Sequence, residues 1–451
     1  MHFRSYIHLI LRTALYELID TLDLNKAQYV VNPSKDFKRK RKLDFKRLVR
    51  LMLTMGSRTI SGEIENEFCE TSIDPDRPSA SAFVQQRSKI KHEAFEFLFR
   101  EFVHSISDLG HLLRFHDWRL YACDGSGINI SRNPDDPDTF IQHCSKGYNQ
   151  IHLNALYDLL NCIYTDVLIQ NAHDKDERGA LGTMAARLSD PEHSIIIADR
   201  GYEGWRSFLS LINSGAGFII RMKSPSSNGI LSVYDFSKEQ SYVKADGSFD
   251  VNISTILTHK QTNEVKENPN KYTYVLNIND IPELKDPNSP YCPISFRVVA
   301  VKLPDGKLEY LATNLDREEF SQDDLKYCYF LRWGIETSFR RLKYTLGLVN
   351  FHSRRKEFVL QEVYARLTFF NYCEGNIQLI QVDQKDANKH VYEIDFDDAV
   401  PTLRTFLKHR DNKVDDLVRL LQRKRIPVRP DRKFGRKVKG QNARIFIYKA
   451  A

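Results

Sequence analysis

The chain has 451 residues, of which 41% are hydrophobic and 28% are charged. This is an ordinary globular composition, and it excludes a wholly disordered or collagen-like chain. No run of residues approaches the roughly eighteen apolar positions that a membrane-spanning helix needs. The seven Cys residues include no C-x-x-C pair, so we expect neither a disulfide framework nor a zinc ribbon, and a reducing cytoplasm fits best.

The net charge of +7 is concentrated at the two ends of the chain. Residues 26–50 carry +8 and residues 404–451 carry +12, which leaves −13 for the remaining residues. Basic ends around an acidic middle indicate that the ends bind a polyanion and the middle binds a cation. A solvated surface is the alternative for either basic segment alone, but two such segments favour a nucleic acid partner.

Residues 1–115 are expected to form a basic, helical, DNA-binding domain. A Ser-rich segment that suits a helix N-cap begins near residue 78, and apolar residues at helical spacing follow it. Arg87 lies on this segment in a cluster with Lys89 and Lys91. We therefore count Arg87 as a candidate DNA contact.

Residues 116–224 are expected to form a mixed α/β sheet. Three apolar segments indicate strands, and a helix, a strand, a second helix and a further strand follow them. That order is typical of a mixed sheet covered by helices. The first strand is expected to run into a Gly-containing turn at residues 124–127, and the second helix to end at Gly215.

Residues 225–317 have the pattern of an all-β insertion. Asp-Gly pairs at 246–247 and 305–306 predict two β-hairpins. Residues 318–403 are expected to be mainly helical. The basic tail of residues 404–451 is expected to bind DNA or to mediate dimerisation.

Three acidic residues stand out by their position. Asp124 and Asp199 follow apolar strands, where an unpaired carboxylate is unfavourable, and Glu336 lies in a predicted helix. If the three converge, they repel one another unless a divalent cation lies between them, and all-oxygen ligands point to Mg²⁺ or Mn²⁺. Each residue alone has an ordinary alternative, because Asp before Gly or Arg-Gly is a turn signal and Glu336 suits a helix surface.

The helix that contains Glu336 offers more than a carboxylate. At about 100° per residue, Tyr329, Arg332 and Lys343 project from the same edge as Glu336, beside an apolar stripe that would seat the helix on the sheet. Two cations and a phenol at this edge suit phosphate oxygens. A surface ion pair between Arg332 and Glu336 is an equally good explanation of that part of the pattern.

The spacing Tyr-x2-Arg-x3-Glu-x6-Lys over residues 329–343 resembles the Tyr-Arg-Glu-Lys signature of the IS-four group of insertion-sequence transposases. DGSG at Asp124 and ADRGY at Asp199 look like the first two acidic blocks of that group, and the β-rich insertion and the basic tail are similar too. The resemblance implies a ribonuclease-H-like core, split between residues 116–224 and 318–403, with Asp124, Asp199 and Glu336 as catalytic triad.

The resemblance also implies a chemistry. Two Mg²⁺ ions, for which Mn²⁺ can substitute, would support hydrolysis at the transposon end and joining of the released 3′-hydroxyl to target DNA. Tyr329, Arg332 and Lys343 would hold the phosphates near the cut. Further candidate DNA contacts are Arg340, Arg221 and Arg87.

The implied partners are the terminal inverted repeats and the target DNA, with a homodimer in the synaptic complex and no membrane. The compartment would be the bacterial cytoplasm at the nucleoid. Two alternatives stay open: a metal-dependent nuclease of the same fold without strand transfer, and a silent DNA-binding regulator derived from a transposase. Trp205 and Trp333 are expected to pack in the core, with stacking on a base as the alternative.

Overall fold

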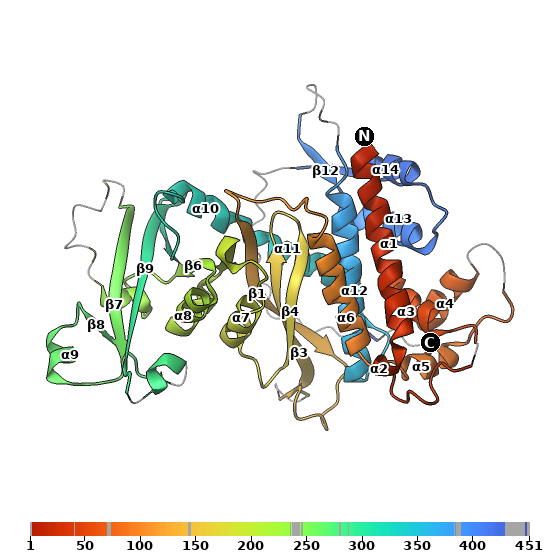
Figure 1. Cartoon of the computed structure of the whole chain (residues 1–451), viewed down its shortest axis with the longest axis horizontal. Helices are drawn as coiled ribbons and strands as arrows, with labels where there is room; N and C mark the ends of the chain where they lie inside the picture. Colours follow the sequence, from red (N-terminus) through yellow and green to blue (C-terminus); the bar gives the residue numbers. More distant parts are fainter. Residues whose placement is uncertain are drawn as a thin grey trace.

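The structure is a computed structural model, and Figure 1 shows it as an elongated molecule. A β-rich part forms one end, a helical part with the N-terminus forms the other, and a mixed sheet lies between them (Figure 1). The described residues are 2–39, 41–69, 74–142, 146–234, 236, 244, 247–278, 281–286, 288–382, 384, 389–428 and 447–448.

The N-terminal part is helical, as predicted. Its helices are α1 (His2–Leu24), α2 (Lys26–Tyr29), α3 (Phe45–Thr54), α4 (Ile60–Phe68), α5 (Ala80–Arg87) and α6 (Glu93–Ser107). The predicted Ser N-cap is present, since Ser79 Oγ accepts a hydrogen bond from Ala82 N at 3.2 Å. Two helices follow this cap because the segment between α5 and α6 pairs with the end of α2, where Ile90 and Val30 form a β-bridge.

These N-terminal helices share a core with the rest of the chain. Helices α1, α3 and α6 pack against α12 (Lys356–Ile377), which is buried on nearly every side. The rings of Phe99 and Tyr364, for example, meet at a centroid distance of 6.2 Å. The long helix α12 therefore joins the helical end to the central sheet (Figure 1).

The central sheet has the predicted order of strands. Its main strands are β1 (Arg119–Ile130), β3 (Tyr148–Asp158), β4 (Ile163–Asn171), β5 (Ser194–Ala198) and β6 (Gly217–Met222), and the short β2 (Phe140–Ile141) also pairs with β3. Strands β4, β3 and β1 are antiparallel neighbours, whereas β5 lies parallel to β1 and β6 parallel to β5. This order, β4-β3-β1-β5-β6, is the ribonuclease-H-like arrangement, and it confirms the predicted fold class.

Helices cover both faces of this sheet. Helices α7 (Glu177–Ala185) and α8 (Trp205–Ser214) contact one face, and α6, α11 (Trp333–Arg340) and α12 lie on the other (Figure 1). Helix α8 ends at Gly215 as predicted, because its φ of 80° is in the left-handed region that glycine accepts without strain. Among the described residues, no helix combines the length and apolarity that a membrane span requires.

The β-rich insertion extends the central sheet. Its elements are β7 (Phe249–Thr258), α9 (Asn263–Glu267), β8 (Tyr272–Tyr274), β9 (Tyr291–Lys302) and β10 (Leu308–Thr313). Strands β9 and β10 form the predicted hairpin, with Gly306 at a φ of 85° in its turn, whereas the first strand of the other predicted hairpin falls outside the described residues. Because β10 pairs with β6, the described strands of the insertion and of the central sheet form one ten-stranded sheet.

The C-terminal third is mainly helical. Helix α10 (Gln322–Leu331) leads directly into α11, and a π-helical turn (Arg341–Thr345) follows. After α12 come α13 (Phe396–Lys408) and α14 (Val414–Arg423), and two small ladders join β11 (Asn350–Phe351) to β14 (Ile447–Tyr448) and β12 (Tyr392–Ile394) to β13 (Arg425–Pro427). The predicted basic tail thus begins as packed helices, while residues 429–446 and 449–451 lie outside the described part.

Candidate active site

The pairing of β1 with β5 brings the first two acidic residues together. Cys123 on β1 lies opposite Ala198 on β5 in the parallel register. Asp124 and Asp199 are the next residues along the two strands. They therefore lie side by side, just beyond the last β1–β5 pair, and on the same face of the sheet. Asp199 Oδ1 accepts a hydrogen bond from Gly201 N at 2.8 Å and thereby caps a short 3₁₀ turn.

The turn predicted at residues 124–127 is wrong, because β1 continues in an extended conformation to Ile130. Glycine is needed here for space: a Cβ on Gly125 would lie 2.7 Å from Glu177 Oε1 and would clash with His152. His152 is buried and its Nε2 lies 2.9 Å from Glu177 Oε1 on the face opposite Asp124. The Asp-Gly pair therefore marks close packing across the sheet and not a turn.

Glu336 reaches the same face from the first turn of α11. Its neighbour Arg332 donates a hydrogen bond from Nη2 to Glu336 Oε1 at 2.8 Å, and Arg332 Nη1 lies 3.7 Å from Asp124 Oδ2. The i,i+4 ion pair considered above is therefore present, but it is not a surface pair, since the Arg332 side chain is only 6% exposed. One buried guanidinium thus bridges the first and the third acidic residue.

The electrostatics of Asp124 show that the three carboxylates interact. The pKa of Asp124 is raised to about 6, chiefly by burial and also by the negative charges of Asp199 and Glu336, while the Gly125 amide and Arg332 act in the opposite direction. Like charges held together in a partly desolvated site favour the neutral form of one of them. A cation at this position would relieve the repulsion.

The donor set fits a hard divalent cation, because three carboxylates offer only oxygen ligands. The oxygen atoms of the three carboxylates do not all lie within 4.8 Å of one another, so the donor types fit a cation but the distances are longer than in a closed metal site. Within the described part of the chain, the one group of three side chains whose ligand atoms all lie within 4.8 Å of one another is His92, Glu93 and Glu357, outside this site. In the acidic cluster, the Arg332 guanidinium occupies the contact between Asp124 and Glu336.

Lys343 and Tyr329 complete the edge of the cluster. Lys343 donates hydrogen bonds from Nζ to Ser126 Oγ at 2.6 Å and to the Gly127 carbonyl at 3.0 Å. Burial lowers the pKa of Lys343 and raises the pKa of the Tyr329 phenol. Ser126 was not singled out from the sequence, although it lies two positions after Asp124 and hence on the same face of the strand.

Comparison with known proteins identifies the family of this site. The family model described as "Transposase DDE domain" matches residues 117–372, which include the sheet, the insertion and all three acidic residues. The chain belongs to the transposase DDE domain family. Members of this family act on DNA with divalent metal ions, so the protein is a DNA transposase.

The chain was also compared with curated protein sequences and with solved structures. No curated protein sequence matches the chain. Among solved structures, a cryo-EM structure of the piggyBac transposase synaptic complex with hairpin DNA is similar at 9% sequence identity and a TM-score of 0.47, over 92% of this chain and 85% of that chain.

Two of the additional candidate DNA contacts lie at the surface of the transposase. Arg221 at the end of β6 is 40% exposed, and its Nε lies 3.1 Å from Glu309 Oε1 on β10. Burial raises the pKa of the Tyr329 phenol, and among nearby charges Arg221 acts to lower it while Glu309 and Asp199 act to raise it. Arg340 is exposed at the end of α11.

The expectation that Arg87 contacts DNA is wrong for this fold. The Arg87 side chain is fully buried, and Nη1 donates to Glu362 Oε1 at 3.0 Å. Arg366 and His352 also bond to Glu362, at 2.9 Å and 3.1 Å. Arg87 therefore belongs to a buried ionic network that fastens α5 to α12.

Trp205 and Trp333, for which stacking on a base was the alternative, differ from each other. Trp205 packs as predicted, since its ring meets Phe208 and Phe296 at centroid distances of 6.1 Å and 5.9 Å. Trp333 is not a core residue, because its side chain is 46% exposed. It lies under the Arg332 guanidinium at 4.9 Å, at the rim of the acidic cluster.

Proposed function

We propose that Asp124, Asp199 and Glu336 are the catalytic, metal-binding triad of this transposase, and that it belongs to the IS-four group. The observation that carries the proposal is that Asp124 and Glu336 meet at one buried guanidinium, and that the pairing of β1 with β5 brings Asp199 beside Asp124. The Tyr-Arg-Glu-Lys spacing over residues 329–343 supports the assignment to the group.

We further propose that the triad holds two Mg²⁺ ions. When bound, two such ions activate the attacking oxygen and stabilise the leaving oxygen of an in-line phosphodiester displacement. Release of Glu336 and Asp124 by Arg332 would free both carboxylates for metal and would leave the guanidinium available for a phosphate. Arg332 thus has two partners of the same chemistry, a carboxylate before DNA arrives and a phosphate afterwards.

The residues around the triad have distinct parts in this scheme. Lys343 supplies a positive charge at β1 beyond Asp124, and Tyr329 supplies a phenol beside Arg332, both for phosphate oxygens near the cut. Arg221 and Arg340 would contact the DNA farther from it. Water would cut at the transposon end, and the released 3′-hydroxyl would then attack the target strand.

A groove on the N-terminal helical part supports DNA binding away from the cut. Its lining includes the exposed cations Lys35, Lys38, Arg39 and Arg41, none of which has a carboxylate partner among the described residues. The single acidic residue of the groove, Asp36, is buried and accepts a hydrogen bond from Asn32 N at 2.8 Å. We assign this groove and the basic tail to the DNA backbone, and we assign synapsis of two ends to a homodimer.

Cleavage and joining on a plasmid test the proposal directly. Purified protein and Mg²⁺ are mixed with a supercoiled plasmid that contains the terminal repeats. Excision with integration is the expected result; excision alone would identify a nuclease, and gel retardation without cleavage would identify a DNA-binding regulator.

Single substitutions of the triad locate the chemistry. Asp124→Asn, Asp199→Asn and Glu336→Gln should each abolish cleavage and leave DNA retardation intact, because neutral amides bind Mg²⁺ poorly. Asp305→Asn in the exposed β9–β10 turn is the matched control and should cleave normally. Full cleavage by any one of the three variants would remove that residue from the triad.

A further inference from the structure

The two basic ends of the sequence meet where helix α3 contacts helix α13. Arg47 and Arg50 project from α3, Lys408 projects from the end of α13, and Glu67 approaches from α4. We call these four residues the α3–α13 seam. None of them belongs to the acidic cluster.

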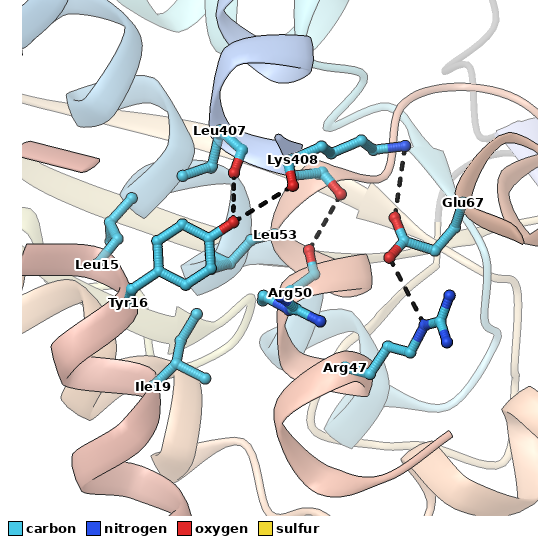
Figure 2. A pocket seen from close by; sticks show the side chains of 10 residues that line it. Leu15, Tyr16, Ile19, Arg47, Arg50, Leu53, Glu67, Leu407 and Lys408 are labelled. Atoms are coloured by element: carbon cyan, nitrogen blue, oxygen red, sulfur yellow. Dashed lines mark hydrogen bonds and ion pairs between the residues drawn. The ribbon is translucent and has the colours of Figure 1, made fainter. Parts of the chain in front are cut away.

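The seam surrounds a cavity of about 100 Å³ (Figure 2). Its walls come largely from α1, α3 and α13, as Figure 2 shows, and they combine apolar side chains with the charged groups of the seam. The other lining residues are Leu15, Tyr16, Ile19, Leu53, Thr54 and Leu407. Tyr16 is already satisfied, since its hydroxyl donates to the Leu407 carbonyl at 2.7 Å, so the polar groups left to act on the cavity are those of the seam.

Charge in the seam is unbalanced. Three cations share a single carboxylate, which leaves a net charge of +2. Glu67 lies 3.5 Å from Lys408 Nζ and 3.9 Å from Arg47 Nε, so neither contact is a close hydrogen bond. Arg50 has no carboxylate partner within the described ranges. The Lys408 side chain is only 8% exposed, so water screens its charge poorly, whereas the Arg47 side chain is 34% exposed and is partly screened.

Donor atoms in the seam are also left without acceptors. The Nε atoms of Arg47 and Arg50 are buried and have no hydrogen-bond partner. Arg404, one turn before Lys408 on α13, has a buried Nε in the same condition. A buried donor without an acceptor is unfavourable by about 1 to 3 kcal/mol, and more for a charged group. Three such arginines around one helix contact are therefore unusual in a folded protein.

We infer that the α3–α13 seam binds a phosphate-type oxyanion. Two guanidinium groups and one ammonium group offer several donors to one ligand, and their excess of +2 matches the charge of a dianion. Guanidinium groups suit the oxygen pairs of phosphate, and the lysine adds a point charge. The anion would accept from the orphaned donors and would join α3 to α13 electrostatically.

Phosphate titration of the full-length protein tests this inference. Thermal unfolding is followed in EDTA while inorganic phosphate replaces chloride at constant ionic strength. A ligand that binds only the folded state raises the midpoint in proportion to ln(1 + [L]/Kd). We expect a saturable rise for the wild type, and a rise that is weakened at least about tenfold in apparent Kd for Arg50→Met, since a charge-assisted hydrogen bond contributes roughly that factor.

Matched variants separate binding from folding. Lys307→Met removes an exposed cation of the β9–β10 turn, outside the seam, and should keep the full phosphate response. Arg50→Met should unfold no earlier than the wild type without phosphate, because it removes a cation that lacks a partner. Should Arg50→Met not fold, Lys408→Met is tested in its place. An equal phosphate response in the wild type and in the seam variant would overturn the inference.

A second arm identifies the source of the anion. Duplex DNA that contains the terminal repeats is added to the phosphate-saturated protein in EDTA. Displacement of phosphate by DNA would assign the seam to a backbone phosphate, whereas simultaneous binding would assign it to a free anion. Both outcomes support an oxyanion site. Because the Glu336→Gln background can be used throughout, failure of this inference leaves the triad proposal unaffected.

Discussion

Lys343 donates a hydrogen bond to the hydroxyl of Ser126 at 2.6 Å. The contact joins the π-helical turn after α11 to the strand that contains Asp124, so a cation lies directly beside the acidic cluster. Burial lowers the pKa of Lys343, and desolvated ammonium groups interact strongly with incoming phosphate. This arrangement makes the lysine a sensitive probe of the proposed site.

Lys343→Met should lower the single-turnover rate of DNA cleavage at least about tenfold, because it removes a partly desolvated charge from a phosphate contact. The midpoint of thermal unfolding should change little, since the unfavourable burial of the Lys343 charge offsets the stabilisation by its hydrogen bonds to β1. Lys307→Met, on the exposed β9–β10 turn, is the control. A variant that cleaves at the wild-type rate would show that Lys343 only fastens the helix to the sheet.

Asp124→Asn should stabilise the metal-free protein at alkaline pH. The folded-state pKa of Asp124 is raised to about 6, chiefly by burial. Its contribution to stability is therefore present below about pH 4 and is lost as the pH rises through about 6. In EDTA at pH 8 we expect the free energy of unfolding of the variant to exceed that of the wild type by about 1 to 3 kcal/mol. At pH 4 we expect the two free energies of unfolding to be equal.

Urea unfolding at the two pH values measures this difference, and added Mg²⁺ provides the second readout. The wild type should gain stability from Mg²⁺, whereas Asp124→Asn should gain little. Equal stability of both proteins at pH 8 would mean that neither burial nor repulsion between the carboxylates destabilises the ionised form of Asp124.

Arg87→Met should destabilise the fold and not act selectively on DNA. The substitution leaves the buried Glu362 without one of its cations. Breaking such a buried pair typically destabilises a protein by about 3 to 5 kcal/mol. The measurement is the free energy of unfolding, compared with DNA affinity at a temperature where the variant is folded. Replacing both Arg87 and Glu362 by Met should recover part of the loss. Weaker DNA binding at unchanged stability would restore the sequence-based expectation.

Neutral substitutions in the N-terminal groove should flatten the salt dependence of DNA binding. Each phosphate contact contributes a slope of about −0.9 in a plot of log affinity against log salt concentration. Replacing Lys35, Lys38, Arg39 and Arg41 by Gln should therefore reduce the magnitude of the slope by about one for every contact that is lost. An unchanged slope would exclude the groove from the DNA backbone.

Truncation should separate the two parts of the basic C-terminal region. A chain that ends at Val428 loses only the two-residue strand β14 from the described part and should fold. It should bind DNA with a smaller salt slope, since residues 429–451 hold eight Lys or Arg residues and one Asp. A chain that ends at residue 403 should be unstable, because it lacks Phe406 and Leu407 of the core. Circular dichroism and gel retardation of both chains check these outcomes.

Much of the candidate site could be predicted from the sequence because its acidic residues lie at places with strong local signals. The apolar run before Asp199 predicts a strand, and the helical spacing around Glu336 predicts a helix. The parallel register of β1 and β5 then brings Asp124 and Asp199 together. The continuation of β1 beyond Asp124 was not accessible. It depends on glycine meeting His152 and Glu177, which are far apart in the sequence from Gly125 and from each other.

Long-range pairing explains the remaining errors in the same way. Arg87 looks like an exposed helical cation until Glu362, 275 residues later, is known to neutralise it. Trp333 looks like a core residue by composition, but the turn of the chain at Arg332 presents it to solvent. Sequence patterns identify which face of a helix is apolar, whereas the partner of a charged side chain is decided by the tertiary fold.

The pairing of β10 with β6 has a mechanical consequence. A module attached by two loose linkers could swing over bound DNA as a hinged arm, but this insertion continues the hydrogen-bonded ladder of the central sheet. Bending of the insertion would therefore twist β6 and its neighbour β5, which ends one residue before Asp199. Force applied at the far end of the molecule would thus be transmitted to the acidic cluster through the backbone itself.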